Sequence, residues 1–200
     1  NHDVLILGDC EVYENISTVT MWENYGISSY IRGSAEQLIW QSYYLLEDTL
    51  KYEKPQVVIL NVLAMTESDA KNEAYNRMTL DGMKLSKYKI ASIRESMTEE
   101  ENMASYIFPL LRYHSRWSEL SSEDFRYMWK TPSVTTNGYL MQKGVRPVTT
   151  IPKAAPLANY TFSDRNMEYL DKIDSLCKDN GINLVACNMR GRSKKYEFCG

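Results

Sequence analysis

The chain has 200 residues, a length that suits one α/β domain with a substantial core and does not require a second domain. Its formal net charge of −3 and its pI near 5.5 argue against a nucleic-acid-binding protein, because such proteins usually present a basic face. The four cysteines show no CxxC spacing, which argues against a zinc or redox site, and no apolar run approaches the ~18 residues that span a bilayer. We therefore expect a globular protein that uses no cofactor and no metal ion.

The chain is rich in aromatic residues, with 15 tyrosines and four tryptophans. We expect most of these rings to pack in the core and between helices. Aromatic rings also form sugar-binding and partner-binding surfaces, because they give a large contact area at a low entropic cost. The sequence leaves both uses open.

The first part of the chain alternates between strand-like and helix-like segments. Short apolar runs predict buried strands over residues 3–7, 27–32 and 56–62. A short helix is expected over residues 18–25, ended by Gly26, and a longer one from the capping box at residues 34–37 to about Lys51. Strands that alternate with helices in this way predict βαβ units and a parallel sheet.

The pattern changes between residues 65 and 160, where we expect a long insertion. A second capping box at residues 98–101 predicts a helix that carries apolar residues as far as position 111, is kinked at Pro109 and continues past His114, and a short helix follows over residues 121–129. Residues 131–157 read as a loop, and long insertions of this kind usually form lids or binding walls.

The α/β pattern resumes near the end of the chain. A helix capped by Ser163 or Asp164 and ended by Gly181 leads into a fourth strand over residues 182–186. Residues 190–200 are charged and lack an apolar pattern, so we expect a solvated, disordered tail. The whole chain, residues 1–200, is predicted to form a single domain.

Candidate functional residues follow the ends of three predicted strands. Cys10 lies just past the first strand, Gly33 lies just past the second, and Asn61 ends the third. In open α/β sheets, ligands bind outside the carboxyl ends of the strands. A glycine at a helix N-terminus lets an anionic centre approach backbone donors, and an asparagine amide adds another donor. A nucleophile that faces such donors has the arrangement that stabilises a tetrahedral oxyanion.

These residues resemble the conserved blocks of a known superfamily. Gly8-Asp9-Cys10 resembles the Gly-Asp-Ser block of the SGNH (GDSL-type) hydrolases, with Gly33 and Asn61 in the places of the oxyanion-hole glycine and asparagine. The stretches 11–13, 32–34 and 111–117 are similar to a bacterial branch of that superfamily. Related proteins by pattern are the polysaccharide O-acetyltransferases and acetylesterases of the alginate-acetylation type. The resemblance covers most of residues 3–187.

The resemblance implies a fold, a location and a substrate class. The fold would be a three-layer α/β/α sandwich with a central parallel sheet, of the flavodoxin-like SGNH type. The protein would lie outside the cytoplasm, with a membrane anchor upstream of residue 1, and would act on acyl esters of a cell-surface polysaccharide. Cys10 would be the nucleophile, Asp9 would brace its turn, and the backbone of Cys10 and Gly33 with the amide of Asn61 would hold the oxyanion.

The sequence departs from the family at the nucleophile. Cysteine replaces serine at position 10; a free thiol is only slightly ionised at neutral pH but is intrinsically nucleophilic. The alternative is a buried, inert cysteine, because free cysteines are often core residues. Asp9 likewise has a purely structural alternative, in which it satisfies backbone N–H groups of the turn.

The second departure is the general base. The Asp-x-x-His block of the family is missing, and the sequence stops before the last strand and closing helix that the family fold would add. The two histidines are His2, near the terminus, and His114. His114 is either a replacement base or an ordinary core or surface histidine.

Two arginines flank His114 on one predicted helix. Arg112 and Arg116 share a helix face because they are four residues apart. They are candidates to bind an anionic sugar or a carboxylate together with His114, and they can equally pair with Glu119 or Asp124.

Two functions therefore remain from the sequence. The first is an ester hydrolase or O-acyltransferase that acts on acetyl or other acyl esters of a cell-surface glycan, with a base supplied by residues missing here. The alternative is a non-catalytic binding or assembly module for cell-envelope polysaccharide. A flavodoxin-like nucleotide binder is disfavoured, because residues 8–10 lack a glycine-rich phosphate loop.

Overall fold

A computed structural model describes residues 1–67, 69–108, 121–122, 136–140 and 161–188 of the chain. Several predicted segments lie wholly or mostly outside the described residues. These are the kink at Pro109 with the helix up to residue 111, most of the helix over 121–129, most of the loop over 131–157, and the tail at 190–200. The candidate ligand-binding residues Arg112, His114 and Arg116 lie outside the described residues as well.

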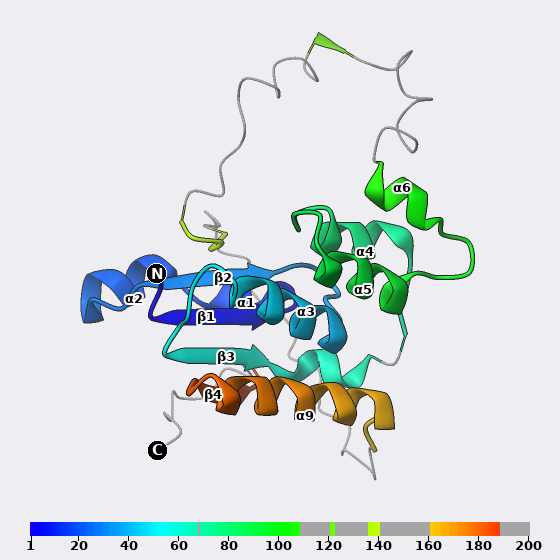
Figure 1. Cartoon of the computed structure of the whole chain (residues 1–200). Coiled ribbons are helices and arrows are strands. Elements are labelled where there is room, and N and C mark those ends of the chain that lie inside the picture. The colour runs from blue at the N-terminus through cyan, green and yellow to red at the C-terminus, as the bar shows by residue number, and fades with distance from the viewer. Residues whose placement is uncertain (68, 109–120, 123–135, 141–160, 189–200) are drawn as a thin grey trace, which may run out of the picture.

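A four-stranded parallel sheet forms the centre of the protein (Figure 1). Its strands are β1 (Val4–Gly8), β2 (Ser29–Gly33), β3 (Val57–Asn61) and β4 (Asn183–Cys187), in the order β2-β1-β3-β4. All three pairings are parallel, which confirms the predicted parallel sheet of an α/β protein. The carboxyl ends of all four strands therefore meet at one edge, where the candidate residues follow them.

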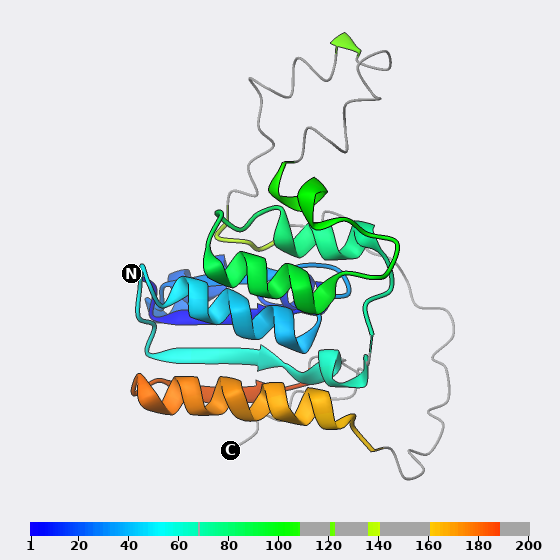
Figure 2. The same ribbon diagram turned by 45° about the vertical axis from the view of Figure 1, so that its right-hand side comes forward.

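One face of the sheet carries the larger core. Because successive side chains of a strand point to opposite faces, Leu5 and Leu7 of β1 point to the same face as Val58 and Leu60 of β3. Helix α3 (Ile39–Thr49) packs on this face between α5 (Lys87–Ser96) and α9 (Asp164–Asp179), as Figure 2 shows.

The other face of the sheet is covered by two short helices. Here α1 (Cys10–Asn15) and α2 (Thr18–Tyr25) lie against β2, and a smaller core forms among Val4, Ile6, Val12 and Ile31. Helices thus lie on both faces of the sheet. Helix α2 has the predicted bounds and ends at Gly26, whose φ of 68° is a left-handed conformation that glycine adopts without strain.

The helix predicted to begin at Ser34 begins instead at Ile39. Ser34 Oγ donates to Gln37 Oε1 at 3.2 Å, so the predicted capping pair closes a turn rather than a helix. Glu36 in this turn has a φ of 57°, which is incompatible with an α-helix. The amide of Leu38 then donates to Gln41 Oε1 at 3.1 Å at the true start of α3.

The part of residues 65–160 that the structure describes adds helices to the main core. These elements are the 3-10 helix η1 (Val62–Thr66), α4 (Glu73–Leu80), α5 and α6 (Met103–Ile107). Leu80, Ile93 and Tyr106 are buried with the residues of α3. The amide of Thr98 donates to Glu101 Oε1 at 3.3 Å as its capping box predicts, but the helix begins after Asn102.

A short segment far along the chain closes the outer edge of the sheet. The amide of Ile31 in β2 donates to the carbonyl of Asn137 at 2.8 Å, and Asn137 Nδ2 donates to the carbonyl of Ser29 at 3.0 Å. The amide of Leu140 donates to the carbonyl of Tyr13 at 3.0 Å. Residues 136–140 therefore occupy backbone groups that an edge strand would otherwise expose. None of the helices in the described ranges is long and apolar enough to cross a membrane.

Candidate functional site

Cys10 is the first residue of α1 and lies at the carboxyl edge of the sheet. Asp9 caps this helix: its Oδ1 accepts a hydrogen bond from the amide of Glu11 at 3.0 Å. The side chain of Cys10 borders a cleft of about 340 Å³. The other residues of the cleft wall that bear on its chemistry are Asp9, Glu11, Glu36, Gln37, Glu67 and Lys71.

Asn61 lies beside the same turn and is fully buried. Its Oδ1 accepts from the amide of Leu63 at 3.0 Å and so caps η1. Its Nδ2 donates to Asp9 Oδ1 at 3.0 Å and makes a longer contact of 3.4 Å with Glu11 Oε2. The structure therefore brings Asp9 and Asn61 together next to Cys10, but both amide donors of Asn61 meet carboxylate oxygens.

Gly33 pairs with Gly8 at the ends of two neighbouring strands. A Cβ atom at position 33 would lie 2.4 Å from Val12 Cγ2 and 3.0 Å from the carbonyl oxygen of Gly8. A Cβ atom at position 8 would lie 2.6 Å from the Cβ of Asn61, and Gly8 also has a φ of 152°. Both glycines thus allow the close packing that holds α1 and Asn61 against the strand ends.

The cleft carries more negative than positive charge. Of the residues that the structure describes, four carboxylates line it, Asp9, Glu11, Glu36 and Glu67, against one lysine, Lys71. Lys71 Nζ lies 2.6 Å from Glu36 Oε2 and 3.4 Å from Glu67 Oε2, so its charge is shared by two of the four carboxylates.

This environment keeps the Cys10 thiol protonated. Burial raises the pKa of Cys10 above its ordinary value, and the negative charges of Asp9 and Glu14 raise it further. Burial also raises the pKa of Asp9. Reactive cysteines usually have the opposite surroundings, with a positive charge nearby that favours the thiolate.

His2 is placed away from this cleft. It precedes β1 at the amino edge of the sheet, where its Nδ1 lies 2.8 Å from Glu53 Oε2 and its ring packs on Tyr30. In the described ranges, no group of three or more histidine, cysteine, aspartate or glutamate residues is placed to hold a metal ion.

The sequence pattern indicates the turn of Asp9 and Cys10 and also Asn61, but it does not indicate the acidic wall of the cleft. Glu11 and Glu36 were each visible as carboxylates within two or three residues of a predicted site residue. Nothing in the sequence indicates that Glu67 and Lys71 line the cleft, because they lie in a region without a recognisable pattern. The 3-10 helix η1 and the segment after it bring them there.

Comparison with known proteins places the chain in no family. No protein-family model matches it, and neither a curated protein nor a solved structure matches it significantly. The fold and the cleft together define an α/β protein with a parallel sheet and a cysteine-bearing cleft at the carboxyl edge of that sheet.

Proposed function

We propose that this protein is an SGNH-type acyl-ester hydrolase or O-acyltransferase that acts on acyl esters of a cell-surface glycan, with Cys10 as the nucleophile. The observation that carries the proposal is the hydrogen bond from Asn61 Nδ2 to Asp9 Oδ1 at 3.0 Å. It joins the end of β3 to the turn that presents Cys10, which is the relationship that the resemblance to SGNH hydrolases implies. The extracytoplasmic location and the glycan substrate come from that resemblance alone.

The chemistry would proceed by acyl transfer to sulfur. The Cys10 thiolate attacks the acyl carbonyl, the alcohol of the ester leaves with a proton, and the acyl group stays on Cys10 Sγ. Water or a sugar hydroxyl then takes the acyl group and restores the thiol. The resemblance assigns the proton transfers to an Asp-x-x-His block, which this sequence does not contain.

Asn61 has two amide hydrogens, and they have different roles in this proposal. One is held by Asp9 at 3.0 Å, which fixes the orientation of the amide. The other makes the longer contact of 3.4 Å with Glu11 Oε2. A carboxylate in this place repels a developing oxyanion. The Glu11 side chain therefore has to turn away before Asn61 can donate a hydrogen bond to the oxyanion.

Two reactions of Cys10 can show whether the cleft stabilises an oxyanion or only leaves the thiol accessible to reagents. Acetylation by p-nitrophenyl acetate passes through an oxyanion, whereas alkylation by iodoacetamide does not. Both rates are to be measured at Cys10 by peptide mass spectrometry at alkaline pH, where the thiolate forms without a general base. The ratio of acetylation to alkylation is expected to rise at least about tenfold in Glu11→Ala, because the second Asn61 N–H becomes free.

Glu14→Ala is the matched control, since Glu14 lies on the same helix and acts on the pKa of Cys10 by its charge. It is expected to change both rates together and to leave their ratio unchanged. An unchanged ratio in Glu11→Ala, or acetylation no faster at Cys10 than at Cys187, would contradict the proposal.

A second function is favoured by a specific observation: both Asn61 donors meet carboxylates, and the Cys10 thiol has a raised pKa. These features suit a non-catalytic module that binds cell-envelope polysaccharide, where carboxylates accept hydrogen bonds from sugar hydroxyls. In that case a glycan array would show binding that survives Cys10→Ala. Binding lost together with acetylation in that variant would favour the enzyme.

A further inference from the structure

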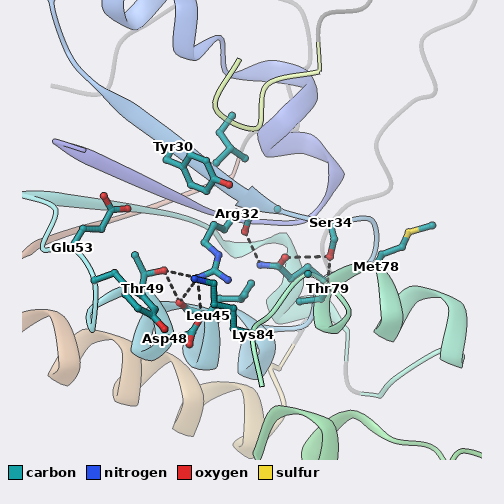
Figure 3. Close-up of a pocket in the computed structure, with 15 residues that line it drawn as sticks. Tyr30, Arg32, Ser34, Leu45, Asp48, Thr49, Glu53, Met78, Thr79 and Lys84 are labelled. Atoms are coloured by element: carbon teal, nitrogen blue, oxygen red, sulfur yellow. Dashed lines mark hydrogen bonds and ion pairs between the residues drawn. The ribbon is translucent and has the colours of Figure 1, made fainter. Parts of the chain in front are cut away.

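A second cavity lies on the other side of the turn that precedes α3. It has a volume of about 410 Å³, within the usual range of about 300–1,000 Å³ for small-molecule sites. Strand β2, the end of α3, the end of α4 and the segment that follows α4 line it, and Arg32 reaches from β2 into its centre (Figure 3). Of the residues named above for the Cys10 cleft, Gln37 also lines this cavity.

Among the described residues, the guanidinium group of Arg32 makes its hydrogen bonds through a single nitrogen. Nη1 donates to Thr49 Oγ1 at 2.8 Å and to the carbonyl of Leu45 at 3.3 Å, as the dashed lines of Figure 3 show. It also lies 3.4 Å from Asp48 Oδ2. Nε and Nη2 have no hydrogen-bond partner among the described residues, although the side chain is only 20% exposed.

This unused edge has a specific geometry. Nε–H and one N–H of Nη2 point in parallel, and this fork matches the two oxygens of a carboxylate. Charge-assisted pairs of this kind are about twice as strong as neutral hydrogen bonds. An arginine side chain that is 20% exposed and has this edge of its guanidinium free, in the wall of a cavity, is therefore suited to bind an anion.

Two cations, Arg32 and Lys84, and two carboxylates, Asp48 and Glu53, line the cavity, and each carboxylate also contacts a residue outside the lining. Asp48 is balanced by Arg32 at 3.4 Å and Lys51 at 4.0 Å. Glu53 accepts from the backbone amide of His2 at 3.1 Å and contacts its ring nitrogen at 2.8 Å. Lys84 forms no ion pair within the described ranges, and its Nζ lies 5.3 Å from the ring centroid of Tyr52.

We propose that this cavity is a binding site for a small carboxylate, held in a bidentate pair by Nε and Nη2 of Arg32 and assisted by Lys84. The rings of Tyr30 and Tyr52 in the cavity wall would lie against the body of the ligand. Asp48 and Glu53 also line the cavity and repel a doubly charged anion more than a singly charged one, which favours a carboxylate over a phosphate. The proposal does not depend on the chemistry of Cys10.

The test pairs each acid with a neutral molecule of similar shape. Glucuronate and glucose, and benzoate and benzamide, are titrated into ¹⁵N-labelled protein, and the Arg32 Nε–H resonance is followed by NMR. We expect at least one acid to shift this resonance and to bind about tenfold or more tightly than its neutral counterpart. The two acids distinguish a sugar acid from an aromatic acid as the source of the carboxylate.

Two variants connect the binding to these residues. Arg32→Lys keeps the charge but removes the fork, and is expected to weaken binding about tenfold. Lys84→Gln changes an exposed side chain, so it keeps the fold intact even if Arg32→Lys does not, and is expected to weaken binding severalfold. Lys87→Gln, an exposed lysine outside the cavity lining, is the control and should bind as the unaltered protein does.

Several results would overturn the proposal. These are equal affinity for acid and neutral molecule in both pairs, tighter binding of inorganic phosphate than of either acid, or affinity that Lys84→Gln leaves unchanged. Each of these results is independent of whether Cys10 forms an acyl adduct.

Discussion

Asp9 and Asn61 form a buried hydrogen bond that joins the ends of β1 and β3, with Asn61 Nδ2 3.0 Å from Asp9 Oδ1. The same oxygen accepts from the amide of Glu11 at 3.0 Å and so caps α1. One carboxylate oxygen thus fixes both the orientation of a buried amide and the start of the helix that carries Cys10. Maintaining a carboxylate in this place has a cost in stability, because Asp9 as a whole residue is only 8% exposed.

Asp9→Asn is expected to stabilise the protein at pH 7. Burial raises the folded-state pKa of Asp9 above its ordinary value of 3.8, with Glu11 and Glu36 adding to the shift. The folded state therefore holds the Asp9 proton more tightly than the unfolded state, and stability falls as pH rises from 3.8 through the raised pKa. Asparagine keeps an acceptor for both hydrogen bonds and removes this loss.

The measurement is urea denaturation of both proteins between pH 3.5 and pH 7. The stability gained by Asp9→Asn should be greatest at pH 7 and should shrink as the pH falls toward 3.8. Asp171→Asn, at an exposed position on α9, is the control and should show no such trend. A variant that is less stable than the unaltered protein at pH 7 would show that the charge itself stabilises the turn.

The reactivity of Cys10 should increase when a nearby negative charge is removed. Burial is the main cause of the raised pKa of Cys10, and Asp9, Glu14 and Glu11 add to it. Glu14→Gln removes one of these charges at an exposed position on α1 and lowers the pKa. At pH 7.5 the thiolate fraction, and with it the rate of alkylation, should rise about two- to threefold.

The rate is measured by iodoacetamide labelling of Cys10 with peptide mass spectrometry as a function of pH. Glu23→Gln, an exposed carboxylate on α2 that does not act on Cys10, should leave the rate unchanged. Labelling of Cys10 as fast as that of a free thiol in the unaltered protein would contradict the raised pKa.

The sequence was sufficient to predict the strands and the parallel sheet, because β1 and β3 are continuous apolar runs of the kind that are buried on both faces. It did not predict α1, because Val12 is its one buried residue and the helix depends on the Asp9 cap. It also did not predict α4 and α5, whose buried positions are largely polar. Those polar residues are Asn76, Arg77, Thr79, Lys89, Ser92 and Ser96.

The candidate site, like the fold, could be predicted from the sequence only in part. The carboxyl edge and its residues followed from strand ends, which the sequence pattern marks. The contact of Asn61 with Glu11, by contrast, depends on the direction of one side chain in a short helix, and no sequence pattern specifies it. The Ser-x-x-Gln pattern at residues 34–37 predicts a helix start, but here Ser34 and Gln37 bond through their side chains and close a turn, and the sequence pattern is the same in both cases.

The docking of α4 and α5 onto α3 depends on a buried polar network. Asn76 Nδ2 donates to the carbonyl of Ser96 at 2.7 Å, and Gln41 Nε2 donates to Asn76 Oδ1 at 3.1 Å. Asn76→Ala would take this donor away from the buried carbonyl of Ser96 and would leave Gln41 Nε2 with Ser96 Oγ, at 3.1 Å, as its remaining acceptor. It should therefore reduce the free energy of unfolding by about 1–3 kcal/mol. Urea denaturation measures this, with the exposed Asn24→Ala as control. A loss below about 0.5 kcal/mol would show that these helices are held by apolar contacts alone.

Substitution of Gly33 tests whether this residue is needed for packing or for catalysis at the predicted oxyanion position. A Cβ atom there would lie 2.4 Å from Val12 Cγ2, so Gly33→Ala should destabilise the protein by about 1–3 kcal/mol. Val12→Ala removes the clashing methyl group. The double variant should therefore be more stable than the sum of the single effects implies, by about 1 kcal/mol.

The carbonyl oxygen of Gly8, 3.0 Å from the same Cβ position, prevents full recovery because a backbone atom cannot be removed by substitution. Urea denaturation of the four proteins gives the coupling energy between positions 12 and 33. Acetylation and alkylation of Cys10 in the double variant then show whether the strand ends still position the nucleophile. Strictly additive effects would mean that α1 shifts as a whole to admit the methyl group, and that Gly33 does not fix the position of Cys10.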